Sequence, residues 1–190
     1  MKKFLAAMTL LFMTGNAAAQ EISPEVDEGI ASVKQKKFSF NAEARTFDSS
    51  PEFILKYKNF SADYVHSHDS EKFLKLKSDK EIFSLMGTGL EWNLALNTVN
   101  EHEKFYFLPS VGINFYMRIR PRLDIYLQFS GFTFGRRAHF EDFESGIKYF
   151  PQKNFSISAG WRRIDFKLRR GADVGNFNKC GWFAGVRYDF

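Results

Sequence analysis

The residues with the clearest potential for chemistry are the histidines, two of which lie beside a serine and an acid. His66-Ser67-His68-Asp69 places a base, a hydroxyl and a carboxylate at consecutive positions. A histidine near a serine and an acid can activate a nucleophile. Both histidines lie in a polar stretch, however, and neither a GxSxG nor an HExxH motif is present. The sequence favours a solvated loop here, with His66, Ser67 and His68 as the catalytic candidates.

Metal and redox chemistry have less support. The pair His66 and His68 has no clear further ligands beside it, so we predict no metal site and no cofactor. The single cysteine, Cys180, excludes an intramolecular disulfide and is interpreted as a small residue of the fold.

Two arginine pairs form a second group with chemical potential. Arg136 and Arg137 follow a glycine, and Arg169 and Arg170 precede one. Guanidinium groups bind phosphate through paired hydrogen bonds, so both pairs are candidates for binding a phosphorylated ligand. The alternative is that they only keep two loops soluble. Their role depends on the elements that position them.

The last residues of the chain indicate that the elements that position these side chains are β-strands. From Asn178 to Phe190, apolar residues recur at every second position, which is the period of a β-strand. One face of this strand carries Trp182, Ala184, Val186, Tyr188 and Phe190.

The same alternation begins near Phe38. In the first third of the chain the predicted strands are short, with turns at Asp48–Pro51 and near Lys58-Asn59. A short strand is predicted over Phe73–Lys77, ending at Ser78-Asp79-Lys80. A membrane-spanning strand needs about nine to eleven residues, so the three strands between Pro51 and Lys77 are uncertain as membrane strands.

The middle of the chain predicts longer strands. Apolar residues from Ile82 to Leu96 are interpreted as one strand, and a proline, Pro121, closes a later turn. The alternation breaks at Arg162-Arg163, where a bulge is predicted to return Ile164 to the apolar face. Ten candidate strands result, and the count falls to eight if some of them merge or lie outside the barrel.

The opposite face of these strands carries Gly, Ser and charges of both signs. We predict that these charges form a hydrogen-bonded network inside a narrow lumen, rather than a selectivity ring. Its expected members are Glu91, Arg118, Arg120, Asp124, Glu144, Lys148 and Arg162.

The first residues predict export. Met1-Lys2-Lys3, an apolar run and Ala17-Ala18-Ala19 have the pattern of a signal peptide over residues 1–19, cleaved at Ala19-Gln20. Residues 20–37 are interpreted either as a short amphipathic helix or as an irregular leader, and residues 38–190 as the folded domain. No apolar run of helix-spanning length follows Gln20.

Composition limits the function classes. Removing residues 1–19 leaves 171 of the 190 residues and lowers the formal net charge from +5 to +3. This charge is too small to indicate nucleic-acid binding. The 23 phenylalanines in a chain of polar average suit a wall with one apolar face, and also suit a soluble β-sandwich.

Signal peptide, long alternating strands, tight turns and the ending GVRYDF resemble small bacterial outer-membrane β-barrels of the OmpA, OmpX and OmpW type. The resemblance implies an all-β, antiparallel up-and-down transmembrane barrel whose last strand closes against the strand beginning near Phe38. It also implies that Gly185, Tyr188 and Phe190 are read by the barrel-assembly machinery. The chain departs from the family in having Phe183 where a polar residue is preferred.

Three functions are then compatible with the sequence. The first is a non-enzymatic monomer with a structural or surface-binding role, contacting outer-membrane lipid and the phosphates of lipopolysaccharide through Arg136, Arg137, Arg169 and Arg170. The second is a lipid-modifying acyl hydrolase or acyltransferase. The third is a narrow channel for small solutes, although eight to ten strands leave little open lumen.

Overall fold

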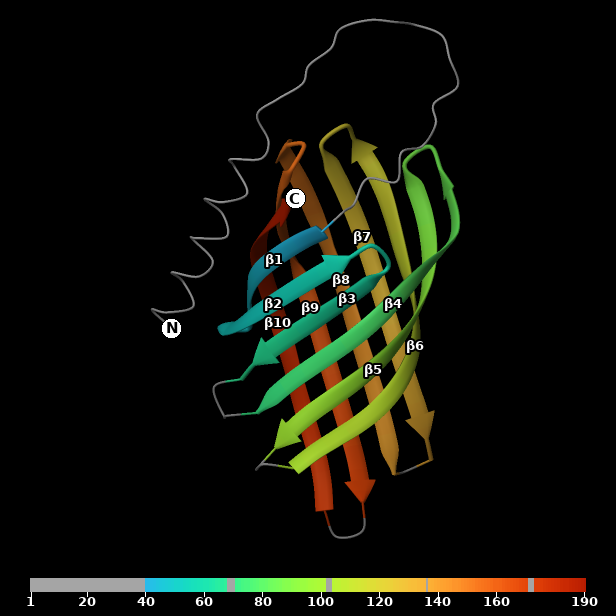
Figure 1. Cartoon of the computed structure of the whole chain (residues 1–190), viewed down its shortest axis with the longest axis vertical. Helices are drawn as coiled ribbons and strands as arrows, with labels where there is room; N and C mark the ends of the chain where they lie inside the picture. The colour runs from blue at the N-terminus through green and yellow to red at the C-terminus, as the bar shows by residue number, and fades with distance from the viewer. Residues whose placement is uncertain (1–39, 68–70, 102–103, 136, 171–172) are drawn as a thin grey trace, which may run out of the picture. The chain divides into compact units, whose positions relative to one another are not determined.

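The computed structural model describes residues 40–67, 71–101, 104–135, 137–170 and 173–190, which form ten antiparallel strands. Each strand pairs with its neighbours in sequence, and β1 also pairs with β10, so the sheet closes into a barrel (Figure 1). The strands are β1 (Phe40–Phe47), β2 (Ser50–Tyr57), β3 (Phe60–His66), β4 (Lys72–Leu85), β5 (Thr88–Glu101), β6 (Lys104–Arg120), β7 (Leu123–Phe134), β8 (Ala138–Gln152), β9 (Phe155–Arg170) and β10 (Asp173–Asp189). The predicted all-β up-and-down barrel of eight to ten strands is confirmed, including its closure between the first and last strands.

The expected signal peptide (1–19) and the helix or leader (20–37) lie outside the described residues. Within the described part of the chain, no helix is long and apolar enough to cross a membrane.

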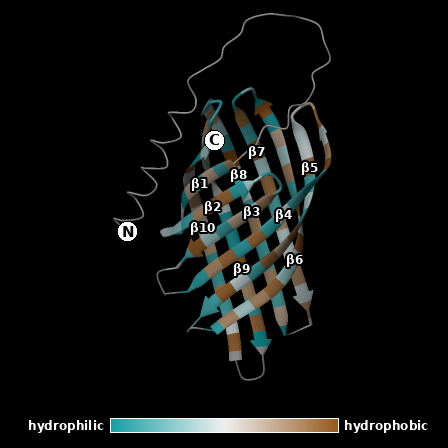
Figure 2. Ribbon diagram, in the orientation of Figure 1, coloured by the Kyte–Doolittle hydropathy of each residue, from teal (hydrophilic) through white to brown (hydrophobic). Residues whose placement is uncertain are grey.

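Side chains alternate between the two faces of the wall because successive residues of a strand point in opposite directions. On β5, Leu94 and Leu96 face outward and are 51% and 41% exposed, whereas Asn93 and Asn97 face the lumen and are fully buried. Figure 2 shows this alternation of apolar and polar residues along the strands. A closed sheet with an apolar outside and a polar inside leaves no backbone group unpaired in lipid, so this is a transmembrane barrel.

The barrel has two different ends. Because the number of strands is even, β1 begins and β10 ends at the same end, where the tight turns β2–β3, β4–β5, β6–β7 and β8–β9 also lie. We call this the inner end, since short turns face the periplasm in barrels of this kind. The opposite, outer end lies at the bottom of Figure 1.

The predicted break at Ser78-Asp79-Lys80 is wrong. Strand β4 continues through it to Leu85, and Asp79 is a lumen residue with only 5% of its surface exposed. The turn comes later, at Met86 and Gly87, whose φ values are 49° and 82°. The single strand predicted from Ile82 to Leu96 is therefore the end of β4 and the start of β5.

The predicted bulge at Arg162-Arg163 is also wrong. Strand β9 pairs with β10 without any shift of register. Arg162 faces the lumen, Arg163 faces outward, and Ile164 and Phe166 face inward with no exposed surface. The alternation therefore continues unbroken, and what changes is the chemistry of the two faces: beyond Arg162 the inside is apolar and the outside is polar.

This exchange produces an apolar core inside the outer end. It consists of Phe47, Val65, Phe73, Val99, Tyr106, Leu108, Ala138, Phe140, Ile164, Phe166, Phe177 and Phe183. The ring of Phe73 stacks on Phe177 and Phe140 at centroid distances of 5.3 and 6.2 Å. We call this group the aromatic core.

The aromatic core forms because β1, β2 and β3 have only 8, 8 and 7 residues. Strand β10 extends beyond the β1–β2 turn and reaches β5, where the backbone N–H of Asn176 donates to Glu101 Oε2 at 3.0 Å. Gly175 allows this approach, since a Cβ there would lie 2.3 Å from the ring of Tyr106. The long strands thus extend past the ends of the short ones, and their inward-facing side chains fill the outer end of the lumen.

Candidate functional site

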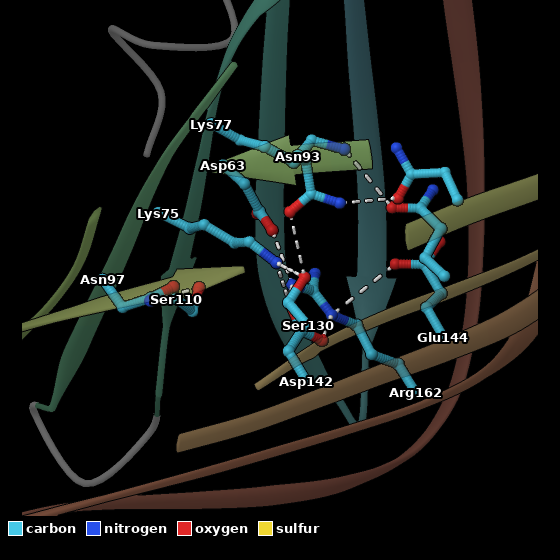
Figure 3. A network of polar contacts seen from close by, with 12 residues as sticks. Asp63, Lys75, Lys77, Asn93, Asn97, Ser110, Ser130, Asp142, Glu144 and Arg162 are labelled. Atoms are coloured by element: carbon cyan, nitrogen blue, oxygen red, sulfur yellow. Dashed lines mark hydrogen bonds and ion pairs between the residues drawn. The ribbon is translucent and has the colours of Figure 1, made fainter. Parts of the chain in front are cut away.

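On the inner side of the aromatic core, the lumen holds a network of buried charges centred on Arg162 of β9 (Figure 3). Its Nε and Nη2 donate to the two carboxylate oxygens of Asp142, at 2.9 and 2.8 Å. Nη2 also contacts Asp63 Oδ2 at 2.7 Å, and Nη1 donates to Glu52. Arg162 thereby joins β9 to β8, β2 and β3 across the lumen.

A second buried arginine, Arg45 of β1, extends the network. Its Nε donates to Glu43 at 2.8 Å and its Nη1 to Glu144 at 2.8 Å. Glu144 also accepts from the hydroxyl of Tyr126 at 2.9 Å, and Glu43 accepts from Ser158 at 2.6 Å. Glu43 and Glu144 thus each accept hydrogen bonds from two donors.

The third buried cation is Lys75 of β4. Its Nζ donates to Asp142 at 2.8 Å and to Ser130 at 3.0 Å. Farther along β4, Asp79 accepts from the Asn114 amide of β6 at 2.9 Å. Polar amides and hydroxyls therefore link the charged pairs into one layer across the lumen.

The network contains six carboxylates and a similar number of cations. The carboxylates are Glu43, Glu52, Asp63, Asp79, Asp142 and Glu144, and the cations are Arg45, Lys56, Lys75, Lys77, Lys148 and Arg162. Opposite charges neutralise each other at short range, which is what allows so many ions to be buried. Such an arrangement can fill and stabilise a lumen.

The structure brings together some of the predicted lumen residues. Glu144, Lys148 and Arg162 belong to the network, and Glu91 lies at its edge, accepting from Asn114 at 3.3 Å. Arg118 and Asp124 instead form a pair of their own at 2.9 Å near the inner rim, where the Arg118 side chain is 54% exposed. Arg120 is exposed on the same strand.

Sequence reasoning missed most of the network. The members it did not name are Glu43, Arg45, Glu52, Lys56, Asp63, Lys75, Lys77, Asp79 and Asp142. Seven of these nine lie on β1, β2, β3 or the first half of β4, in the stretch where the predicted strands looked too short. These charged residues alternate with the outward-facing apolar residues of the same strands. That alternation was the signal that could have identified them as lumen residues.

The catalytic candidates do not form a site among the described residues. His66 is exposed at the end of β3 and stacks on Tyr64 at 6.5 Å, whereas Ser67 is buried and its N–H donates to the carbonyl of Glu71 at 2.9 Å. His68 lies outside the described residues. In the ranges that the structure describes, no three His, Cys, Asp or Glu side chains are grouped as metal ligands would be.

The two arginine pairs lie close together. The N–H of Arg169 donates to the carbonyl of Arg137 at 2.8 Å, because β8 and β9 are neighbours and these residues stand at their outer ends. Both side chains are exposed. Arg136 and the side chain of Arg170 lie outside what the structure describes.

The residues of the expected assembly signal lie in or after β10. Gly185 pairs with Arg45 of β1, and a Cβ at Gly185 would lie 2.4 Å from Arg45 Cγ. Glycine therefore leaves room for the buried arginine at the seam. Tyr188 is half-buried at the end of the strand, and Phe190 follows it in sequence.

The sequence matches no protein-family model and no curated protein. Three solved structures are similar in fold. The KdgM porin in complex with disordered oligogalacturonate has a TM-score of 0.45 and 11% identity, over 80% of this chain and 99% of that one. The NanC porin has a TM-score of 0.36 and 7% identity, over 80% and 100%. Neisserial surface protein A has a TM-score of 0.27 and 13% identity, over 80% and 97%. Similarities this distant do not indicate what the present barrel binds or transports.

Proposed function

We propose that this chain, a small β-barrel of the bacterial outer membrane, is a closed and non-enzymatic surface-binding protein that contacts the phosphates of lipopolysaccharide. The observation that carries the proposal is a group of exposed cations on the outward face of β9 and just before β8, beyond the apolar band. We call it the outer basic strip; it consists of Arg137, Arg163, Lys167 and Arg169.

The position of the outer basic strip along the wall suits a lipid headgroup. Trp161 lies two residues before Arg163 on the same face of β9 and pairs with Trp182, which is 76% exposed. Exposed tryptophans are typical of the boundary between hydrocarbon and headgroups. This order along β9 supports the proposal that the cations that follow meet lipopolysaccharide phosphates, which arginine binds through paired hydrogen bonds.

Two acids lie on the same outward face. Arg163 contacts Asp165 at 3.4 Å, with side chains that are 44% and 20% exposed, and Glu141 pairs with Asp165 across the strands. An ion pair at such an exposed site contributes little free energy. A phosphate carrying a full charge can therefore compete with Asp165 for the guanidinium of Arg163.

Replacing Arg137, Arg163, Lys167 and Arg169 together with glutamine should weaken lipopolysaccharide binding at least tenfold. The change removes four cations while keeping side chains of similar length, so the wall itself is preserved. Binding of the folded barrel to immobilised lipopolysaccharide measures the effect.

The matched control removes four exposed cations at the inner end, through Arg118→Gln, Arg120→Gln, Arg122→Gln and Lys153→Gln. Lipopolysaccharide binding should be nearly unchanged in this variant. An equal loss in the two variants would mean that only the total charge matters, and would contradict the proposal.

The channel hypothesis has less support. The aromatic core fills the outer end of the lumen, and the charged network fills its middle. We expect planar-bilayer recordings of the folded barrel to show no discrete conductance steps under moderate voltage. Stable, reproducible steps would contradict a closed lumen.

A further inference from the structure

Within the charged network, on its inner side, lies a polar cavity of about 110 Å³ that is lined by residues from eight strands. Seven cationic side chains and four carboxylates line it. It reaches the inner ends of β1, β2 and β10, where the side chains of Lys56 and Arg187 are 31% and 24% exposed. The cavity is therefore accessible from the periplasm, while the aromatic core closes the other side.

The cations of this cavity differ in how tightly they are paired. Deep in the lumen, Lys75 and Arg162 contact carboxylates at 2.7–2.8 Å. Nearer the mouth, Arg187 also pairs closely, with Asp189 at 2.7 Å. The three lysines there lie farther from their acids: Lys77 and Lys56 approach Asp79 at 3.2 and 3.4 Å, and Lys148 approaches Glu43 at 3.8 Å. Two carboxylates of the network, those of Asp79 and Glu52, do not line the cavity. The cavity wall therefore carries more cations than carboxylates, although the network as a whole is nearly neutral.

The lining also contains one acceptor without a donor. Asp63 Oδ2 contacts Arg162, but the buried Oδ1 has no hydrogen-bond partner among the described residues, and 10% of the side chain is exposed. A buried acceptor without a partner is unfavourable. A ligand suited to this cavity therefore carries several acceptor oxygens for the lysines and one O–H for Asp63.

We propose that the cavity is a binding site for inorganic phosphate in a protonated form, entered from the periplasm. Inorganic phosphate keeps at least one proton at neutral pH, so it offers both the acceptor oxygens and the O–H. Sulfate lacks the proton, and a phosphate monoester, with a pKa of about 6, has mostly lost it. The size is suitable, because one water needs only about 10–15 Å³ of such a cavity. This site is separate from the outer basic strip and does not depend on its function.

The test is calorimetric titration of the folded barrel, in phosphate-free detergent at pH 7, with inorganic phosphate, sulfate and glycerol phosphate in turn. Phosphate should bind saturably with one site per barrel, and the other two anions at least tenfold more weakly. Lys148→Gln and Lys56→Gln should each weaken phosphate binding about tenfold. The control Lys153→Gln removes an exposed cation at the same end, outside the cavity lining, and should leave binding unchanged.

A second variant tests the role of the proton. Asp63→Asn replaces the acceptor with a group that can donate, so phosphate should bind more weakly and sulfate should bind about as well as phosphate. Three results would overturn the proposal: no saturable binding of phosphate, equal weakening in Lys153→Gln, or an unchanged preference for phosphate in a folded Asp63→Asn barrel. The shift in gel mobility on heating identifies which variants are folded.

Discussion

Replacing Arg162 with alanine should destabilise the folded barrel by about 3–5 kcal/mol, or prevent folding, because it leaves buried carboxylates without their partner. Arg162 is 2% exposed and donates to Asp142 and Glu52 while contacting Asp63. These acids come from three different strands. Without the guanidinium, their mutual repulsion acts in a lumen that has little water to screen it.

Urea unfolding in lipid vesicles, followed through tryptophan fluorescence, measures this loss. The matched control is Arg118→Ala at the inner rim, where the side chain is 54% exposed and its ion pair is with Asp124. The control should lose less than about 1 kcal/mol. Similar losses in the two variants would show that the buried network contributes no special stability.

The second large effect is expected at Phe73. Phe73→Ala should lower the free energy of unfolding by about 3–5 kcal/mol, as large-to-small changes in well-packed cores do. Phe73 has no exposed surface and stacks on Phe140 and Phe177, so its removal leaves a cavity between β4, β8 and β10.

Phe105→Ala is the control for this second prediction. Phe105 is on the outer half of β6 but is 60% exposed, so its truncation creates no cavity and should cost about 1 kcal/mol or less. If Phe73→Ala were as mild as Phe105→Ala, the aromatic core would be loosely packed and the lumen would not be firmly closed.

The architecture could be predicted from the sequence because alternation is a local property. The two-residue period from Leu123 to Phe129, or from Trp182 to Val186, identifies a strand and its two faces without knowledge of its neighbours. Closure between β1 and β10 followed from the resemblance and an even strand count. The adjacency of Arg137 and Arg169 follows once β8 and β9 are neighbours.

The position of the β4–β5 turn and the unbroken course of β9 could not be predicted, because the face of a strand that is apolar changes along its length. Within the membrane the lumen face is polar, and Asp79 belongs to that face. The polar run Ser78-Asp79-Lys80 was therefore interpreted as a turn, although it lies inside β4. Beyond the membrane the inside is apolar, and Ile164 and Phe166 face inward. Apolar residues thus move to the other alternate positions of β9, and this change was interpreted as a bulge although the register is unbroken. Whether the apolar face of a strand points outward or inward depends on where the hydrocarbon layer ends. The sequence of a single strand does not show where that boundary lies.

The partners within the network are a further limit. Arg162 contacts Glu52 across 110 positions of sequence, and Arg45 contacts Glu144 across 99. Such pairings are set by the diameter of the barrel and the tilt of its strands. Sequence parity indicates that these charges share the lumen, but not which of them meet.

The seam between β1 and β10 is short, since β1 pairs only from Asn41 to Phe47 while β9 pairs along nearly all of β10. Few ladder hydrogen bonds therefore distinguish the correct closure from one displaced by two residues. The lumen supplies the missing discrimination: a displaced β1 would carry Glu43 and Arg45 away from Ser158 and Glu144. The buried ion pairs therefore favour the observed register of β1 over one displaced by two residues.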